Sequence, residues 1–142
     1  MERYYTPEIE EFYVGFVFEV HEEHWQKMIV NEHLQLSAIK SQIDKKVIRV
    51  KHLDEEDLKR LTFNPTIDNE EIELSFQSKR FIGGPSAGDD YRIIVLHSVK
   101  NQSTWIYKNY NSGGETDLFK GVIKNISELK KLLKQLEINL DK

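Results

Sequence analysis

The fold is decided around the stretch from residue 12 to residue 20, which reads Phe12-Tyr13-Val14-Gly15-Phe16-Val17-Phe18-Glu19-Val20. Alternate side chains of a β-strand point to opposite faces of its sheet. Five apolar residues of this stretch have the same parity and would share one face: Phe12, Val14, Phe16, Phe18 and Val20. We therefore predict a strand with one face against a core, which the rest of the chain must cover.

Further strands are predicted outward from this stretch, at 47–53, 71–77, 91–99, 104–110 and 118–124. The segment 71–77 alternates strictly, which is typical of a half-exposed strand. The segment 91–99 is apolar on both parities, which favours a central strand covered on both faces. We expect it to pair as a hairpin with 104–110, which is rich in aromatic and β-branched residues. Residues 21–30 fit no single pattern, and residues 31–45 are predicted to be a loop with some packed side chains.

Two helices are predicted. The first spans 54–61, where Asp54 is a suitable N-cap, Asp57 stands at the capping-box position, and Leu53 and Leu58 can form a hydrophobic staple. The second closes the chain after Asn125 or Ser127. Its leucines recur at the spacing of one helix face: Leu129, Leu132, Leu133 and Leu136. The predicted fold is one α+β domain over residues 1–142: a mainly antiparallel sheet of five or six strands, the short helix at 54–61, and the C-terminal amphipathic helix packed on the sheet.

Composition narrows the classes of function. The 142 residues include no cysteine, which excludes disulfides, thiolate metal sites and cysteine nucleophiles. The net charge of −4 disfavours general nucleic-acid binding. We see neither a secretory signal nor an apolar run as long as a membrane helix, and therefore expect a cytoplasmic protein. Acids dominate residues 1–32 and lysines dominate residues 118–142. These are two solvated surfaces, or they attract each other within a chain or between subunits of a homo-oligomer.

The most irregular stretch, residues 78–90, is predicted to be a loop and offers the first candidate site. Lys79 and Arg80 could meet an anion, Gly83 and Gly84 would let backbone amides approach it, and Ser86 adds a hydroxyl. The stretch is not a P-loop, because it lacks the lysine-serine/threonine ending and does not open a helix. The alternative is a hairpin connection in which glycine and proline only form turns.

The strand at 104–110 offers the second candidate through Trp105 and Tyr107. Aromatic side chains beside lysine can stack on bases, can form an interface, or can belong to the core. We include both residues in the predicted ligand-binding site.

The histidines offer little chemistry. His21 and His24 have a spacing that binds zinc on a helix, but no further ligands complete a site, so we predict no metal and no cofactor. His97 is either a core histidine or a pocket residue. No nucleophile stands at motif spacing from a base, and we predict no catalytic residues.

Three stretches resemble a known family: Arg3-Tyr4-Tyr5-Thr6-Pro7-Glu8-Ile9-Glu10-Glu11-Phe12 running into Gly15-Phe16; Arg49-Val50-Lys51-His52-Leu53-Asp54 with Asp57; and Phe119-Lys120-Gly121 with Ile123-Lys124-Asn125 into Ser127-Glu128-Leu129. Together they are similar to small uncharacterised proteins of bacteriophages and mobile elements of Bacteroidetes. Val17 departs from the acid of the family's Gly-Phe-Glu-Phe pattern, and the loop at 83–88 looks like an addition. The resemblance implies a phage or prophage protein that acts inside the host cell, and it carries over no site residues.

Two functions are therefore expected. In the first, the chain binds and sequesters a small anionic, nucleotide-like ligand in the host cytoplasm, countering host defence. In the alternative, it is a non-enzymatic interaction module that binds a host or phage protein through an exposed aromatic surface or a sheet edge.

Overall fold

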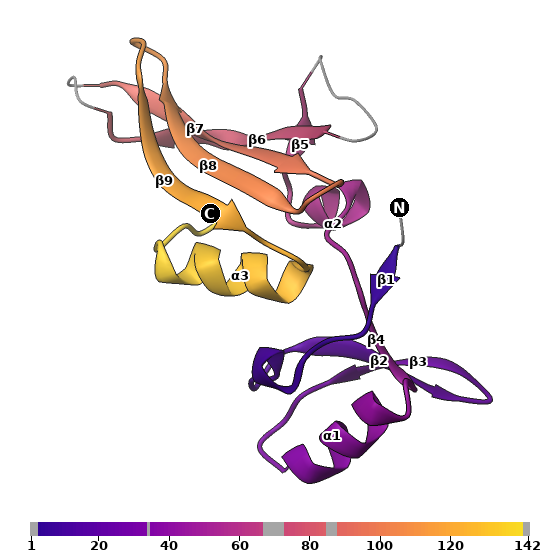
Figure 1. Cartoon of the computed structure of the whole chain (residues 1–142). Coiled ribbons are helices and arrows are strands. Elements are labelled where there is room, and N and C mark those ends of the chain that lie inside the picture. The colour runs from indigo at the N-terminus through magenta and orange to yellow at the C-terminus, as the bar shows by residue number, and fades with distance from the viewer. Residues whose placement is uncertain (1–2, 34, 67–72, 85–87, 141–142) are drawn as a thin grey trace. The chain divides into compact units, whose positions relative to one another are not determined.

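A computed structural model of the chain describes residues 3–33, 35–66, 73–84 and 88–140. It is an α+β protein with two antiparallel sheets, of four and five strands, and a helix near its C-terminus (Figure 1). The chain separates into two compact units, Met1–His52 and Leu53–Lys142. The single domain predicted over residues 1–142 stays a prediction. In the part of the chain that is described, no helix has the length and apolar character needed to cross a bilayer.

The first unit contains the four-stranded sheet, in the order β1-β4-β2-β3. Its strands are β1 (Tyr4–Tyr5), β2 (Val17–Glu22), β3 (His24–Ile29) and β4 (Ile48–Lys51). A short 3-10 helix (Ile9–Glu11) and the helix α1 (Leu36–Asp44) complete the unit. One core holds the buried apolar side chains: Phe16, Phe18, Val20, Val30, Ile39, Ile48 and Val50.

The strand predicted from residue 12 begins only at Val17. Phe16, Phe18 and Val20 are buried as the parity indicated, but Val14 is 65% exposed. The reason is a turn at Gly15, whose φ of +99° lies in the left-handed region that glycine adopts readily. Phe12 still packs on the same cluster, with its ring centroid 4.8 Å from that of Phe16. The prediction that Phe12, Phe16 and Phe18 share one cluster is therefore confirmed, although Phe12 and Phe16 lie outside the strand.

The loop predicted over residues 31–45 is wrong, because the helix α1 spans Leu36–Asp44. Its signals are weak: Gln35 at the N-cap makes no side-chain cap bond, and only Ile39 is buried. The ambiguous residues 21–30 complete a β-hairpin, since β2 pairs with β3 from Val17 opposite Ile29 to Glu22 opposite His24.

The second unit contains the five-stranded sheet, in the order β5-β6-β7-β8-β9. Its strands are β5 (Asn64–Pro65), β6 (Glu73–Ile82), β7 (Asp90–Ser98), β8 (Ser103–Tyr110) and β9 (Glu115–Val122). The predicted hairpin of 91–99 with 104–110 is confirmed as β7 and β8. The strand predicted at 71–77 is confirmed from Glu73 onward, whereas residues 71 and 72 lie outside the described residues.

Both predicted helices are confirmed in this unit. The helix α2 spans Glu55–Arg60 and has Asp54 as its N-cap. The Asp54 carboxylate accepts from the Asp57 amide at 3.0 Å and forms the predicted capping box. The helix α3 spans Ile126–Gln135 and has Asn125 as its N-cap, whose Oδ1 accepts from the Glu128 amide at 2.9 Å. Leu129 and Leu133 of α3 join the core of this unit. Figure 1 shows α3 lying beside β9 on one side of the five-stranded sheet.

Strand pairing gives the five-stranded sheet two different faces. The core side holds Leu74, Phe76, Ile93, Val95 and Ile106 together with the helix leucines. Residues of the other parity lie on the opposite side, which we call the open face. Its cross-strand rows are Ser75, Leu96 and Trp105; then Gln77, Ile94 and Tyr107; then Arg80, Arg92 and Asn109. Ile94 is nevertheless only 6% exposed; its cross-strand partners on this face are Gln77 and Tyr107.

Candidate functional site

The candidate site is a polar hollow of about 330 Å³ near one end of the open face. Strands β6, β7 and β8 supply its lining, together with the first residue after β8: Gln77, Arg80, Asp90, Tyr91, Arg92, Asn109, Tyr110 and Asn111. Arginine and amide side chains offer several hydrogen-bond donors within one small space. The hollow is thus suited to an oxygen-rich, negatively charged group.

A β-bulge brings the two arginines of the hollow together. Gln77 lies opposite Ile94 and Arg80 lies opposite Arg92, so Ser78 and Lys79 together oppose a single residue of β7. The buried Ser78 hydroxyl accepts from the Ile93 amide at 2.8 Å and satisfies the donor that the bulge leaves without a strand partner. The bulge is therefore held by a specific bond, and it places Arg80 on the open face three residues after Gln77.

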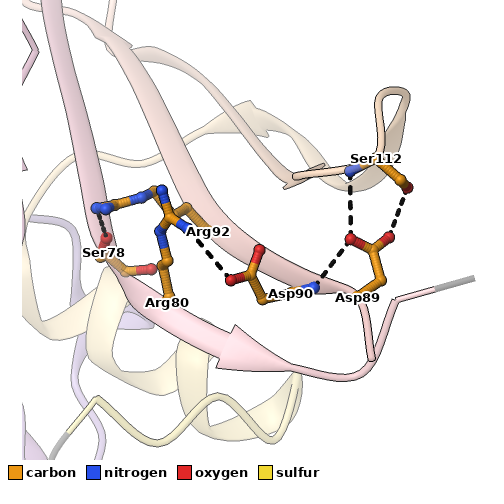
Figure 2. A network of polar contacts seen from close by, with 6 residues as sticks. All are labelled: Ser78, Arg80, Asp89, Asp90, Arg92 and Ser112. Atoms are coloured by element: carbon orange, nitrogen blue, oxygen red, sulfur yellow. Dashed lines mark hydrogen bonds and ion pairs between the residues drawn. The ribbon is translucent and has the colours of Figure 1, made fainter. Parts of the chain in front are cut away.

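The arginines have few partners of their own. Figure 2 shows Arg80 reaching Asp90, with Nη1 3.3 Å from Oδ2, and Arg92 donating to the Ser78 carbonyl at 3.1 Å. Like charges directly opposite each other in a sheet destabilise it. Among the described residues that line the hollow, two guanidinium groups meet one carboxylate, that of Asp90, so these residues carry an excess of positive charge.

An aromatic pair lies on the same face, nearer the start of β8. The rings of Trp105 and Tyr107 have centroids 4.3 Å apart. The Trp105 indole Nε1 donates to Asp117 Oδ1 at 2.8 Å, and Lys120 Nζ lies 4.8 Å from the indole ring. Burial, with the nearby Glu115 carboxylate as a smaller cause, raises the pKa of the Tyr107 hydroxyl above its ordinary value of 10.0.

A second hollow, of about 300 Å³, lies on the far side of this pair. Its polar lining comes from Glu73, Ser75, Ser98 and Ser103, and Trp105 forms one wall. His97 also borders it, but this histidine is buried, with Nδ1 2.7 Å from the Thr104 hydroxyl oxygen. The structure is compatible with both readings of His97, which is buried and also borders this hollow.

The predicted loop of residues 78–90 is corrected by the structure. Strand β6 extends to Ile82 and β7 begins at Asp90, so Lys79 and Arg80 lie on a strand. They also point to different sides: Arg80 lies on the open face, whereas Lys79 Nζ is 5.6 Å from the ring of Phe81, which packs against the core. The structure thus brings Arg80, Trp105 and Tyr107 to one face, and Lys79 does not join them.

The glycines of the connection have a structural role of their own. Asp89 is buried there, and its carboxylate accepts from the Asp90 amide at 2.9 Å, from the Ser112 amide at 3.2 Å and from the Ser112 hydroxyl at 2.6 Å (Figure 2). A side chain at Gly84 would overlap this carboxylate. Gly83 donates its amide to the Asp89 carbonyl at 3.1 Å, and Ser86 lies outside the described residues. An anion against Gly84 would meet the charge of Asp89, so we place the candidate site on the open face.

The residue that the sequence pattern missed is Arg92. It is the one cation within the segment 91–99, and it has the parity of Ile94 and Leu96. A lone arginine in an otherwise apolar strand was the signal that could have revealed it. The zinc spacing of His21 and His24 gains no support, because they lie on paired strands and no group of three or more metal-ligating side chains occurs among the described residues.

Comparison with protein-family models, with curated proteins and with solved structures gave no match. The function must therefore be argued from the geometry of the open face.

Proposed function

We propose that this chain is a binding protein for a small anionic, nucleotide-like ligand, which it holds on the open face of the five-stranded sheet. One observation carries the proposal: Arg80 and Arg92 lie opposite each other in a polar hollow, where Asp90 is the one carboxylate that lines it among the described residues. An anionic ligand would relieve the repulsion between the two guanidinium groups. Arginine is well suited to phosphate and carboxylate, because its planar fork can make two parallel hydrogen bonds.

The neighbouring aromatic pair supports a ligand with a flat ring as well as an anionic group. Tyr107 lies opposite Ile94, two residues from Arg92 along β7. Two residues of a strand span about 7 Å, which is of the same order as the separation of phosphate and base in a nucleotide. Stacking on an aromatic side chain contributes about 1–3 kcal/mol per base. An anion at the arginines and a base beside Tyr107 and Trp105 would thus be bound together.

The groups in the hollow favour binding over catalysis. Arginine and amide side chains fix an anion in place, and the carboxylate of Asp90 already contacts Arg80. Sequestration needs no more than such contacts. In the phage setting that the resemblance implies, trapping a nucleotide-like signal in the host cytoplasm would counter a host defence.

The proposal is tested with Arg80→Ala, whose side chain is 56% exposed and can be removed without opening the core. A charge-assisted hydrogen bond contributes about 1.5–3 kcal/mol. We therefore expect affinity to fall by roughly 10- to 150-fold. The matched control is Lys79→Ala, which removes the same charge from the adjacent residue on the other side of the strand.

The measurement uses fluorescence of Trp105 in a Trp25→Phe background, because the chain has only two tryptophans. Inorganic pyrophosphate, mononucleotides, and linear and cyclic dinucleotides serve as probes. A loss in Arg80→Ala with full binding in Lys79→Ala supports the site. Equal loss in both variants would instead point to the 79–90 segment as first predicted from the sequence. Unchanged binding in Arg80→Ala would refute the hollow as the site.

Native mass spectrometry on gently purified protein, repeated after denaturation, identifies a natural ligand. Extra mass that disappears on denaturation and matches a nucleotide would support sequestration. If none of the probes binds and no small molecule co-purifies from infected cells, the alternative, a protein-interaction module, takes its place.

A further inference from the structure

The free edges of the two sheets differ in how well they are protected against pairing with another strand. Natural sheets block their edges with very short strands, proline, bulges or charges. In the five-stranded sheet, β5 has two residues and includes Pro65. At the other edge, β9 has a register shift against β8 between Ile106 and Tyr107 and carries Glu115, Asp117 and Lys120. Both edges of this sheet are therefore blocked.

The four-stranded sheet protects its two edges unequally, and Lys27 is the one acidic, lysine or arginine residue of β3. Its β1 edge has two residues, whereas β3 has six and forms the other edge among the described residues. The register of β3 against β2 is continuous from Val17 opposite Ile29 to Glu22 opposite His24. Met28 and Ile29 are 44% and 59% exposed, and β3 contains no proline. A long, regular and partly apolar edge is a template for strand addition.

The backbone groups of β3 that are free to pair can be assigned from the ladder. Val30 donates its amide to the Phe16 carbonyl at 2.9 Å, so residues of this parity bond toward β2. In an antiparallel ladder, bonding alternates from one residue to the next. Trp25, Lys27 and Ile29 therefore direct their amide and carbonyl groups outward, away from β2.

We propose that β3 pairs antiparallel with β3 of a second copy of this chain, about a two-fold axis at Gln26. In this register Trp25 lies opposite Lys27 of the partner subunit, and the reverse pair forms on the other side of the axis. A cation over an indole ring is a favourable pair. A shift of the axis to Lys27 would instead place two lysines opposite each other, which is unfavourable. Of these two registers, the charge of Lys27 favours the one centred at Gln26.

The chain's lack of cysteine allows a direct test of the register. With the axis at Gln26, the two copies of this residue form a non-hydrogen-bonded pair with their Cα atoms about 4.5 Å apart. That separation falls within the range of about 4.4–6.8 Å that disulfides need. Gln26→Cys should therefore form a disulfide-linked dimer on mild oxidation. Ser41→Cys, on the exposed side of α1, reports random collision, and Lys27→Cys reports the shifted register.

Sedimentation of the unmodified chain gives the second measurement. We expect a mass of twice 16.8 kDa for the wild type. Lys27→Pro should return the chain to a monomer, because it removes an outward amide at an edge position where proline is tolerated. Circular dichroism confirms that this variant is folded, and the cysteine experiment stands if it is not.

Three outcomes would overturn the proposal. The first is a monomeric wild type. The second is a dimer that a folded Lys27→Pro leaves intact. The third is linkage of Gln26→Cys no faster than that of Ser41→Cys, or slower than that of Lys27→Cys. A monomer whose β3 resonances shift when another protein is added would assign the same edge to a different partner, and would equally refute pairing between copies.

Discussion

Each sheet carries arginine on the face away from its core, but the contacts of the guanidinium groups differ between the two sheets. In the four-stranded sheet, Arg49 lies between two rings, 3.6 Å from the centroid of Tyr4 and 4.1 Å from that of Trp25. Its guanidinium also contacts Glu19 at 3.0 Å. In the five-stranded sheet, Arg80 and Arg92 lie opposite each other with Asp90 beside them. Arg49 is thus enclosed by side chains of its own unit, whereas the facing pair Arg80 and Arg92 forms the site proposed for an anionic ligand.

The largest expected effect is on the free energy of unfolding, and it comes from a substitution in the core of the first unit, which shows whether the two sheets can be compared as separate units. Phe16 is fully buried, and truncation of such a phenylalanine costs about 3–5 kcal/mol. We expect Phe16→Ala to lower the free energy of unfolding reported by Trp25 in a Trp105→Phe background. Urea unfolding followed by fluorescence measures it. An equal loss reported by Trp105 in a Trp25→Phe background would show that both sheets unfold together, and that neither can be assigned its own stability.

A smaller effect separates the two kinds of arginine. Arg49→Ala removes two cation–π contacts and leaves the apolar surface of both rings uncovered, which should cost about 1–3 kcal/mol. Arg80→Ala removes an exposed side chain and should change the stability by less than about 0.5 kcal/mol. Chemical denaturation of the two variants gives both values. Equal losses would mean that Arg80 is as structural as Arg49, and the comparison would fail.

The smallest effect comes from the Tyr107 hydroxyl, whose pKa is raised in the folded state mainly by burial. Its contribution to stability is complete below the ordinary tyrosine pKa of 10.0 and is lost as the pH rises through the folded pKa. As the pH rises from 10.0 to the folded pKa of Tyr107, the Tyr107→Phe variant should lose less stability than the wild type. Thermal unfolding at pH values on both sides of 10.0 measures the difference. Parallel curves for the two proteins would show that this hydroxyl does not titrate differently on folding.

The elements that could be predicted from the sequence have strong local signals. Asp54 and Asp57 mark the start of α2, and the leucine spacing marks α3. The helix α1 was missed because it buries only Ile39 and lacks a side-chain cap. The division into two sheets was also missed, because strand patterns indicate which residues face a core but not which core they share.

The positions of the site residues could be predicted only where side chains alternate regularly along a strand. Trp105 and Tyr107 share a face on a regular strand, and they lie together as expected. Arg80 was predicted to lie in a loop, because the bulge at Ser78 breaks the alternation of β6 and the sequence then resembles an irregular connection. Arg92 was missed because its apolar neighbours dominate the pattern of β7.

The β-bulge in β6, at which the Ser78 hydroxyl accepts from the Ile93 amide, is equivalent to the insertion of one residue into this strand. Gln77 and Arg80 share a face although two residues lie between them, so Lys79 acts as the extra residue. A chain without that residue would keep the same residues on each side of the sheet, while β6 would lose the added local twist that a bulge produces. The bulge thus affects how Arg80 is oriented toward Arg92 without changing the face on which Arg80 lies. Deletion of one residue would therefore alter the geometry of the candidate site without replacing any residue that lines it.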